Sequence, residues 1–303
     1  MTAAAESSAR PVVGVVGLGI MGGGMARHLL GAGYEVVGYD VAETATSAFT
    51  GAGGTALGSP GAVADACDLV MLSLPSIAAF REVVAGAAGL ASVGSPRARV
   101  VADTSTMPLD LKEWARDALA SQGVHLLDCT IVGTGAQMAD KDAVFYASGD
   151  NADALSMAEA VLADCGTGVF HLGAFGNGTR LKLVANLLVT AHNAVAGEAL
   201  ALARHGGIDP AVALPALAAT GASSRILELR GPMMVAGNYE PATMKVDTFM
   251  KDVEIITAFA KACRVPVPVF AAAAQLHVAA QACGWGGADT ASVHAIVERL
   301  AGA

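Results

Sequence analysis

Short β-branched runs alternate with helical patterns in the first half of the chain, and this alternation limits the possible folds more than any other feature. The runs lie at residues 12–16, 35–39, 69–74, 99–102, 124–129, 143–147 and 169–172. Strands that alternate with helices pack as a mostly parallel sheet with helices on both faces. We therefore expect an α/β fold with a doubly wound, Rossmann-type sheet in this part of the chain.

The second half carries no strand signal after Gly173. A long helical pattern covers 176–204, and further helical patterns follow at 223–236, 247–263, 268–283 and 290–301. Asp209-Pro210, an N-cap followed by a first helical residue, opens one more helix. The chain is expected to have two domains, a sheet domain over 11–174 and an all-helical domain over 175–303, joined through the long helix. Residues 1–10 are expected to form a mobile tail.

The charge balance and the lengths of the apolar runs argue against nucleic acid and membranes as partners. Lys and Arg number 18 against 27 Asp and Glu, so the net charge of −9 repels phosphate backbones and anionic lipid surfaces. A membrane-spanning helix needs about 20 consecutive apolar residues. The longest stretch without a charged residue, 265–288, is interrupted by prolines, glutamines and a Gly-Trp-Gly-Gly run.

The scarcity of charge predicts self-association. Charged residues make up 15% of the chain, against about 25% in an average soluble protein. Monomers rarely expose apolar patches above about a few hundred Å², so we expect a homodimer or homotetramer formed through the helical half. The alternative is that alanine, which is small and weakly hydrophobic, inflates the apolar count. Five scattered cysteines without a C-x-x-C pair favour a reducing, cytoplasmic location.

A glycine-rich run at residues 17–22 (GLGIMG) follows the first strand directly and opens a helix with apolar residues every four positions. In such a strand-loop-helix the first glycine permits a tight turn, the second lets the backbone approach a pyrophosphate, and the third lets helix and strand pack closely. The motif alone is weak, because glycine-rich turns are common in a chain rich in alanine and glycine. The expected dinucleotide contacts are Gly17, Leu18, Gly19, Ile20, Met21 and Gly22.

The position of Asp40 makes the glycine-rich motif a strong signal for a dinucleotide site. It ends the second strand 21 residues after Gly19, close to the spacing of about 20 expected for a carboxylate that binds the adenosine ribose. That carboxylate would repel a 2′-phosphate, and residues 41–50 contain no Lys or Arg to hold one. NAD is therefore favoured as the cofactor over NADP. The alternative is that Asp40 only forms a turn at the strand end.

The long helix carries three polar residues on one face of an otherwise apolar pattern. Asn186 lies one turn after Lys182, and Asn193 returns to within about 20° of the same direction. A single lysine more often reaches solvent along an apolar surface. Near the positive end of a helix and partly desolvated, however, the ammonium form is disfavoured, so the lysine pKa is expected to fall towards a value useful for proton transfer. We expect Asn186 to orient the lysine or a substrate hydroxyl.

Several motifs together resemble the β-hydroxyacid dehydrogenase family, a 6-phosphogluconate dehydrogenase-like group that includes 3-hydroxyisobutyrate dehydrogenases and tartronate semialdehyde reductases. In chain order they are the glycine loop, Leu74-Pro75, Asp103-Thr104-Ser105-Thr106, the G-x-G-x-x-x-K-x-x-x-N run at 176–186, Phe249-Met250-Lys251-Asp252, and Gly284-Trp285-Gly286 ahead of Asp289. The resemblance covers nearly the whole chain. It implies that Lys182 is the catalytic acid or base and that Asn186 assists it. The cofactor would be lined by Leu74, Pro75, Thr106 and, at the nicotinamide end, Lys251.

The substrate loop departs from the family pattern. Relatives read Asp-Ala-Pro-Val-Ser-Gly-Gly where this chain has the run DCTIVGT at 128–134, so Val132 replaces the serine that would bind the substrate carboxylate. The backbone N–H groups of Gly133 and Thr134 can still bind an anion, and Thr134 can supply a hydroxyl. The expected substrate contacts are Ser105, Val132, Gly133 and Thr134. His277 stands where many relatives carry a tyrosine.

The leading hypothesis is an NAD-dependent oxidoreductase that interconverts a small, anionic 3-hydroxy acid and its semialdehyde or 3-oxo acid. One alternative is a reductase of imines or larger carbonyl compounds, motivated by the less polar Val132. Another is a non-catalytic dinucleotide-binding module, against which the presence of both Lys182 and Asn186 argues. No metal is expected, because the histidines lack metal-ligand spacing. Cys129 is expected to be a buried, unreactive thiol, and Asp252 is a better functional candidate than Asp247.

Overall fold

The computed structural model describes residues 10–302, so the expected tail lies outside the described residues except for Arg10. The chain divides into two compact units, which we call the sheet unit, ending at Lys182, and the helical unit, beginning at Leu183. This division falls inside the long helix. The boundary expected at 174/175 lies a little earlier, between the last strand and the start of that helix.

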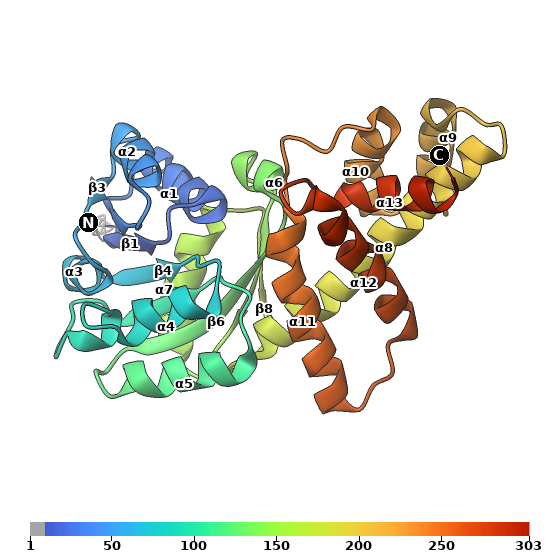
Figure 1. Ribbon diagram of the computed structural model, residues 1–303. Coiled ribbons are helices and arrows are strands. Elements are labelled where there is room, and N and C mark those ends of the chain that lie inside the picture. The colour runs from blue at the N-terminus through green and yellow to red at the C-terminus, as the bar shows by residue number, and fades with distance from the viewer. Residues whose placement is uncertain (1–9, 303) are drawn as a thin grey trace, which may run out of the picture. The chain divides into compact units, whose positions relative to one another are not determined.

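The described strands of the sheet unit form one eight-stranded sheet (Figure 1). Its strands are β1 (Val13–Val16), β2 (Val36–Tyr39), β3 (Thr55–Ala56), β4 (Leu69–Leu72), β5 (Val100–Asp103), β6 (His125–Val132), β7 (Val144–Ser148) and β8 (Gly168–His171). They lie in the order β3-β2-β1-β4-β5-β6-β7-β8, and all neighbours are parallel except β6 and β7. The first six strands have the order of a dinucleotide-binding sheet, so the expected doubly wound fold is confirmed.

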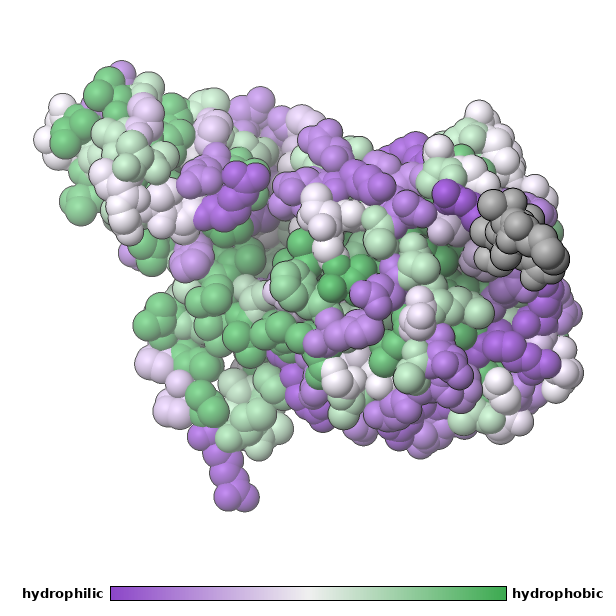
Figure 2. Space-filling model, turned by 180° about the vertical axis from the view of Figure 1, so that it is seen from behind, coloured by the Kyte–Doolittle hydropathy of each residue, from purple (hydrophilic) through white to green (hydrophobic). Residues whose placement is uncertain are grey.

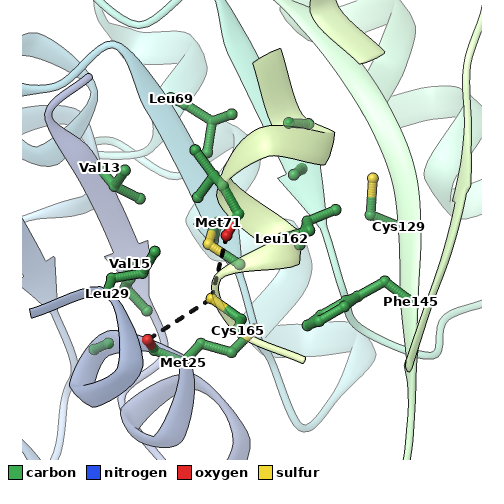
Figure 3. Close-up of a cluster of buried hydrophobic side chains, with 14 of the residues drawn as sticks. Val13, Val15, Met25, Leu29, Leu69, Met71, Cys129, Phe145, Leu162 and Cys165 are labelled. Atoms are coloured by element: carbon green, nitrogen blue, oxygen red, sulfur yellow. Dashed lines mark hydrogen bonds between the residues drawn. The ribbon is translucent and has the colours of Figure 1, made fainter. Parts of the chain in front are cut away.

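Helices cover both faces of this sheet, and each face has its own hydrophobic core. The helices are α1 (Ile20–Gly31), α2 (Glu43–Gly51), α3 (Pro60–Ala66), α4 (Ile77–Ala85), α5 (Leu109–Ala120), α6 (Gly135–Ala139) and α7 (Ala152–Ala163). One core packs α1 and α7 against the sheet around Met25, Phe145 and Leu162, with the Cys165 thiol close to two backbone carbonyl oxygens (Figure 3). The other core packs α3, α4 and α5 against the opposite face around Phe80. Burial on both faces explains why β1 and β4 are apolar at every position.

Over residues 183–302, the helical unit begins within α8 and contains five further α-helices. The helices are α8 (Asn177–His205), α9 (Pro210–Ala218), α10 (Arg225–Ala236), α11 (Val246–Cys263), α12 (Pro268–Ala280) and α13 (Val293–Leu300). The expectation of a helical second half is therefore confirmed. Within residues 10–302, α8 is also the one helix whose length and hydropathy would suit a membrane span, but half of its most apolar window is buried, as in a core helix.

Some element boundaries differ from those expected. No alternation pattern predicts β3, because two residues are too few to show one. The helix expected over 268–283 ends as an α-helix at Ala280, and a π-helical turn with Gly284 at φ 86° follows. The helix expected over 290–301 begins as a 3₁₀ turn, because the Asp289 carboxylate accepts a hydrogen bond from the N–H of Ala291 and opens the turn there.

Candidate active site

The glycine loop lies between the carboxyl end of β1 and the start of α1. Gly17 has φ 91°, and a Cβ there would clash with the carbonyl oxygen of Ser73. A Cβ at Gly22 would clash with the carbonyl oxygen of Gly17, whereas one at Gly19 would meet no heavy atom within 4 Å. The start of α1 also has no side-chain cap. Open space beside uncapped N–H groups is what an approaching pyrophosphate needs, so this loop fits a dinucleotide.

Asp40 follows β2 and lies against the glycine loop. Its Oδ2 accepts a 2.6 Å hydrogen bond from the N–H of Leu18, and its Oδ1 accepts a 2.8 Å hydrogen bond from the N–H of Ala42. The carboxylate therefore forms a turn at the end of the strand, as the alternative interpretation requires. It is also held beside the glycine loop. Its neighbour Val41 is 87% exposed, which leaves this strand end open to solvent.

The Leu74-Pro75 and Ser105-Thr106 segments follow β4 and β5, which are adjacent in the sheet. The buried Ser105 hydroxyl accepts a 2.9 Å hydrogen bond from the N–H of Leu74. The N–H of Ser105 donates in turn to Oδ1 of Asp103, also at 2.9 Å. Ser105 thus connects the two segments that are expected to line the cofactor. Its contact with the substrate stays a prediction.

The expected substrate loop leaves β6 at Val132 and turns sharply at Gly133, which has φ 153°. Thr134 then caps α6, since its hydroxyl accepts a 3.3 Å hydrogen bond from the N–H of Gln137. The Gln137 side chain reaches back and accepts a 3.0 Å hydrogen bond from the N–H of Thr134. The N–H of Thr134 is therefore engaged within the loop, whereas its hydroxyl proton can still be donated to a ligand.

Lys182 lies in the second turn of α8 and is only 8% exposed, so it does not reach solvent along the helix surface as the alternative interpretation required. Asn186, one turn later, is buried, and its Nδ2 donates a 2.9 Å hydrogen bond to Oδ2 of Asp252. Nζ of Lys251 lies 3.5 Å from Oδ1 of the same aspartate. An amide whose nitrogen donates in this way presents its oxygen as an acceptor. Asn193, the third polar residue of this face, instead donates through its Nδ2 to the carbonyl oxygen of Thr290 within the helical unit.

The remaining candidates have structural explanations. Cys129 is fully buried, and burial raises the pKa of its thiol, so it is the unreactive thiol that was expected. His277 is also fully buried, and burial lowers its pKa to about 4. Within the described part of the chain, no group of three or more His, Cys, Asp or Glu side chains could hold a metal ion.

Among the buried charged residues that the sequence did not point to, Lys112 lies nearest to the predicted motifs. Lys112 lies on α5 with its Nζ between the carboxylates of Asp103 and Asp128. Both aspartates stand in motifs that the sequence analysis identified, but nothing in the local pattern of α5 distinguishes this lysine from an exposed one. Only the pairing of the two aspartates in adjacent strands could have indicated it.

A Rossmann sheet with an open glycine loop, followed by a helix with a buried lysine, defines a class of dinucleotide-dependent oxidoreductases. Residues 12–173 match the family described as the NAD binding domain of 6-phosphogluconate dehydrogenase. Residues 176–297 match the family described as NAD-binding of NADP-dependent 3-hydroxyisobutyrate dehydrogenase. The chain therefore belongs to the β-hydroxyacid dehydrogenase family, whose members are NAD(P)-dependent enzymes acting on CH–OH groups, and the resemblance found in the sequence is confirmed.

Individual relatives agree with this assignment. The L-threonate dehydrogenase of Cupriavidus necator is 35% identical over 93% of this chain and 94% of its own length. The crystal structure of 3-hydroxyisobutyrate dehydrogenase from Salmonella typhimurium gives a TM-score of 0.85 at 29% identity, over 94% of this chain and 99% of that one. An imine reductase from Pseudomonas sp. gives a TM-score of 0.55 at 21% identity, over 94% of this chain and 98% of that one, a likeness that shows the fold alone.

Proposed function

We propose that the protein interconverts a small 3-hydroxy acid and its semialdehyde or 3-oxo acid with NAD, and that Lys182 is the general acid and base. In the oxidising direction the proton of the substrate hydroxyl passes to the neutral amine of Lys182. At the same time the carbon that bears this hydroxyl loses a hydride and becomes a carbonyl carbon. The bound nicotinamide supplies the hydride acceptor. The burial of Lys182 in the second turn of α8 carries this proposal, because a buried amine can take and return a proton out of reach of bulk water.

Asn186 is proposed to orient the reacting groups. Because its Nδ2 is bound to Asp252, its Oδ1 is available to accept a hydrogen bond from the lysine ammonium or from the substrate hydroxyl. Asp252 would act through Asn186, by fixing which end of the amide faces the reaction. Lys251, paired with Asp252 at 3.5 Å, stays the expected contact at the nicotinamide end.

NAD is proposed as the preferred cofactor. A phosphate on the adenosine ribose would lie close to the Asp40 carboxylate, which is already held at the glycine loop by the N–H of Leu18. Residues 41–50 offer no Lys or Arg to offset that repulsion.

The substrate is proposed to be a small anion bound at the end of β6. The hydroxyl of Thr134 and the backbone of Gly133 would contact its carboxylate, with Ser105 as a further contact. Val132 removes the hydroxyl that relatives have at this position, so the pocket is less polar there. The similarity to L-threonate dehydrogenase makes four-carbon acids with several hydroxyls the first compounds to test.

The less polar Val132 also motivates the second candidate, reduction of an imine or of a larger carbonyl compound on the same fold. A substrate panel separates the candidates: purified protein with NAD and 3-hydroxyisobutyrate, 3-hydroxypropionate or L-threonate, and with NADH and cyclic imines. Turnover of a hydroxy acid supports the proposal. Turnover of imines alone contradicts it, and cofactor binding without turnover of any compound would favour a binding module.

A homodimer or homotetramer is proposed as the assembled form, in the reducing environment of the cytoplasm. Val184, Leu188, Val195 and Leu202 lie along one side of α8 and are 47–75% exposed. Figure 2 shows green, hydrophobic residues gathered over the surface of the helical unit. A second copy of the chain would cover this stripe. All five cysteines are unpaired, as expected for a reducing compartment.

A further inference from the structure

Two adjacent strands place like charges side by side in the sheet unit. Asp103 ends β5, Asp128 lies in β6, and the two residues are directly paired in the parallel register. Both side chains are fully buried. Two carboxylates this close cannot both stay ionised in a buried site unless a positive charge neutralises them.

Lys112 supplies that positive charge. It lies on α5, the helix that connects β5 to β6, and it is fully buried. Its Nζ is 2.7 Å from Oδ1 of Asp128 and 2.9 Å from Oδ2 of Asp103. Burial alone would lower the pKa of this lysine, but the two carboxylates outweigh burial and raise it. The lysine therefore stays charged between the two carboxylates.

The two carboxylates hold different segments of the candidate site. Asp128 accepts hydrogen bonds from the N–H of Thr179 at 2.6 Å and from its hydroxyl at 2.8 Å, in the first turn of α8. Asp103 accepts a 2.9 Å hydrogen bond from the N–H of Ser105, whose hydroxyl in turn accepts from the N–H of Leu74. A continuous series of contacts, buried except at Leu74, therefore runs from the segment after β4 to the start of α8.

The first turn of α8 leads directly to Lys182, which lies three residues after Thr179. Beside Thr179, the N–H of Gly178 donates a 3.0 Å hydrogen bond to the hydroxyl of Ser148, and its carbonyl oxygen accepts a 2.9 Å hydrogen bond from the hydroxyl of Thr130. A Cβ at Gly178 would lie 2.5 Å from a backbone carbonyl oxygen, so this turn packs closely against the sheet. Any shift of the turn moves Lys182 with it.

We propose that Lys112 is a positioning residue for the reaction: by pairing with both Asp103 and Asp128, it fixes the turn that carries Lys182 relative to the Leu74 segment. This inference rests on the proposed role of Lys182 as acid and base. A purely structural role for Lys112 would affect stability alone, whereas a positioning role also changes the mobility of the turn and the rate of the reaction.

Hydrogen exchange measures how often the first turn of α8 opens to solvent, and it requires no substrate. In Lys112→Met one carboxylate must take up a proton or move away, so the amides of Gly178 and Thr179 should exchange roughly tenfold faster than in the wild type. Leu119→Ala is the matched control, because Leu119 is buried on the same helix and is apolar. That control should lower the Tm but leave the exchange of both amides within about twofold.

Kinetics and a rescue variant complete the test. With the hydroxy acid that the substrate panel identifies, Lys112→Met should lower kcat by roughly tenfold or more, while the Kd for NAD changes less than about threefold, because Asp40 and the glycine loop are untouched. Lys112→Met/Asp103→Asn removes the conflict between the two carboxylates and keeps an oxygen to accept from Ser105. This double variant should restore most of the amide protection and most of kcat. If the single variant does not fold, the double variant is compared with the wild type in its place.

The outcomes distinguish this inference from the proposed function. Equal amide exchange in Lys112→Met and Leu119→Ala, or no recovery in the double variant, would overturn the positioning role. If exchange responds as expected but Lys182→Ala keeps a near-normal kcat, the contact network holds the turn as proposed while the role of Lys182 is wrong.

Discussion

His277 is a buried polar group whose influence on stability can be calculated. Both of its ring nitrogens lack a hydrogen-bond partner among the described residues, and the ring packs edge-on against Phe249 with the centroids 5.4 Å apart. Burial, together with the nearby positive charge of Arg230, lowers its pKa from 6.5 to about 4. The folded protein therefore keeps this imidazole neutral in a range where the unfolded chain protonates it.

The sign of the pH effect follows from this difference. Below about pH 6.5 the unfolded chain binds a proton that the folded protein does not bind until about pH 4. The stability that depends on neutral His277 is thus fully present above about pH 6.5 and is lost as the pH falls towards 4. Almost all of the change between pH 7.5 and 5.0 occurs below about pH 6.5, where the unfolded chain begins to bind the proton. Over those roughly 1.5 pH units, at about 1.36 kcal/mol each, the free energy of unfolding falls by about 2 kcal/mol.

His277→Phe keeps an aromatic ring in the same place but cannot titrate. Between pH 7.5 and 5.0 the wild type should lose about 2 kcal/mol more stability than this variant. Urea unfolding at fixed protein concentration measures the difference, and a Trp114→Phe background leaves Trp285 to report on the helical unit. The pKa of His294 is also lowered by burial, but His294 is present in both proteins and cancels. The same pH dependence in both proteins would refute the reasoning.

Three further predictions concern the cofactor, the assembly and the start of α8. Asp40→Ser/Val41→Arg should raise kcat/KM for NADP relative to NAD by roughly tenfold or more, and a wild type that already prefers NADP would contradict the role of Asp40. Val195→Glu/Leu202→Glu should give a mass near 30.1 kDa in light scattering, whereas a wild type of that mass would contradict self-association. Gly178→Ala should lower stability by about 1–3 kcal/mol in thermal unfolding, because its Cβ meets backbone atoms, and an unchanged Tm would contradict that packing.

The sequence predicts the sheet unit well because its strongest signals are local. β1 and β4 are buried on both faces and therefore read as continuous apolar runs. The glycine loop and Asp40 have a fixed spacing that follows from the geometry of a strand, a turn and a helix. Local sequence patterns are therefore sufficient to locate both features along the chain.

The contacts that organise the candidate site could not be predicted in this way, because they join residues distant in sequence. The hydroxyl of Ser105 binds the N–H of Leu74, 31 residues earlier, and Asp128 binds Thr179, 51 residues later. Lys112 has the same local surroundings in sequence as an exposed helical lysine, and only the register of β5 with β6 explains its burial. Asn193, which the helical spacing places on the same face as Lys182 and Asn186, binds the carbonyl oxygen of Thr290, 97 residues later.

Lys182→Ala tests the central claim most directly. We expect kcat to fall roughly 100- to 10,000-fold, as for the loss of a general acid or base, while the Kd for NAD measured by calorimetry stays within about threefold. Lys261→Ala, which removes an exposed lysine of α11, is the control and should leave both quantities unchanged. A Lys182→Ala variant with near-normal kcat would contradict the account.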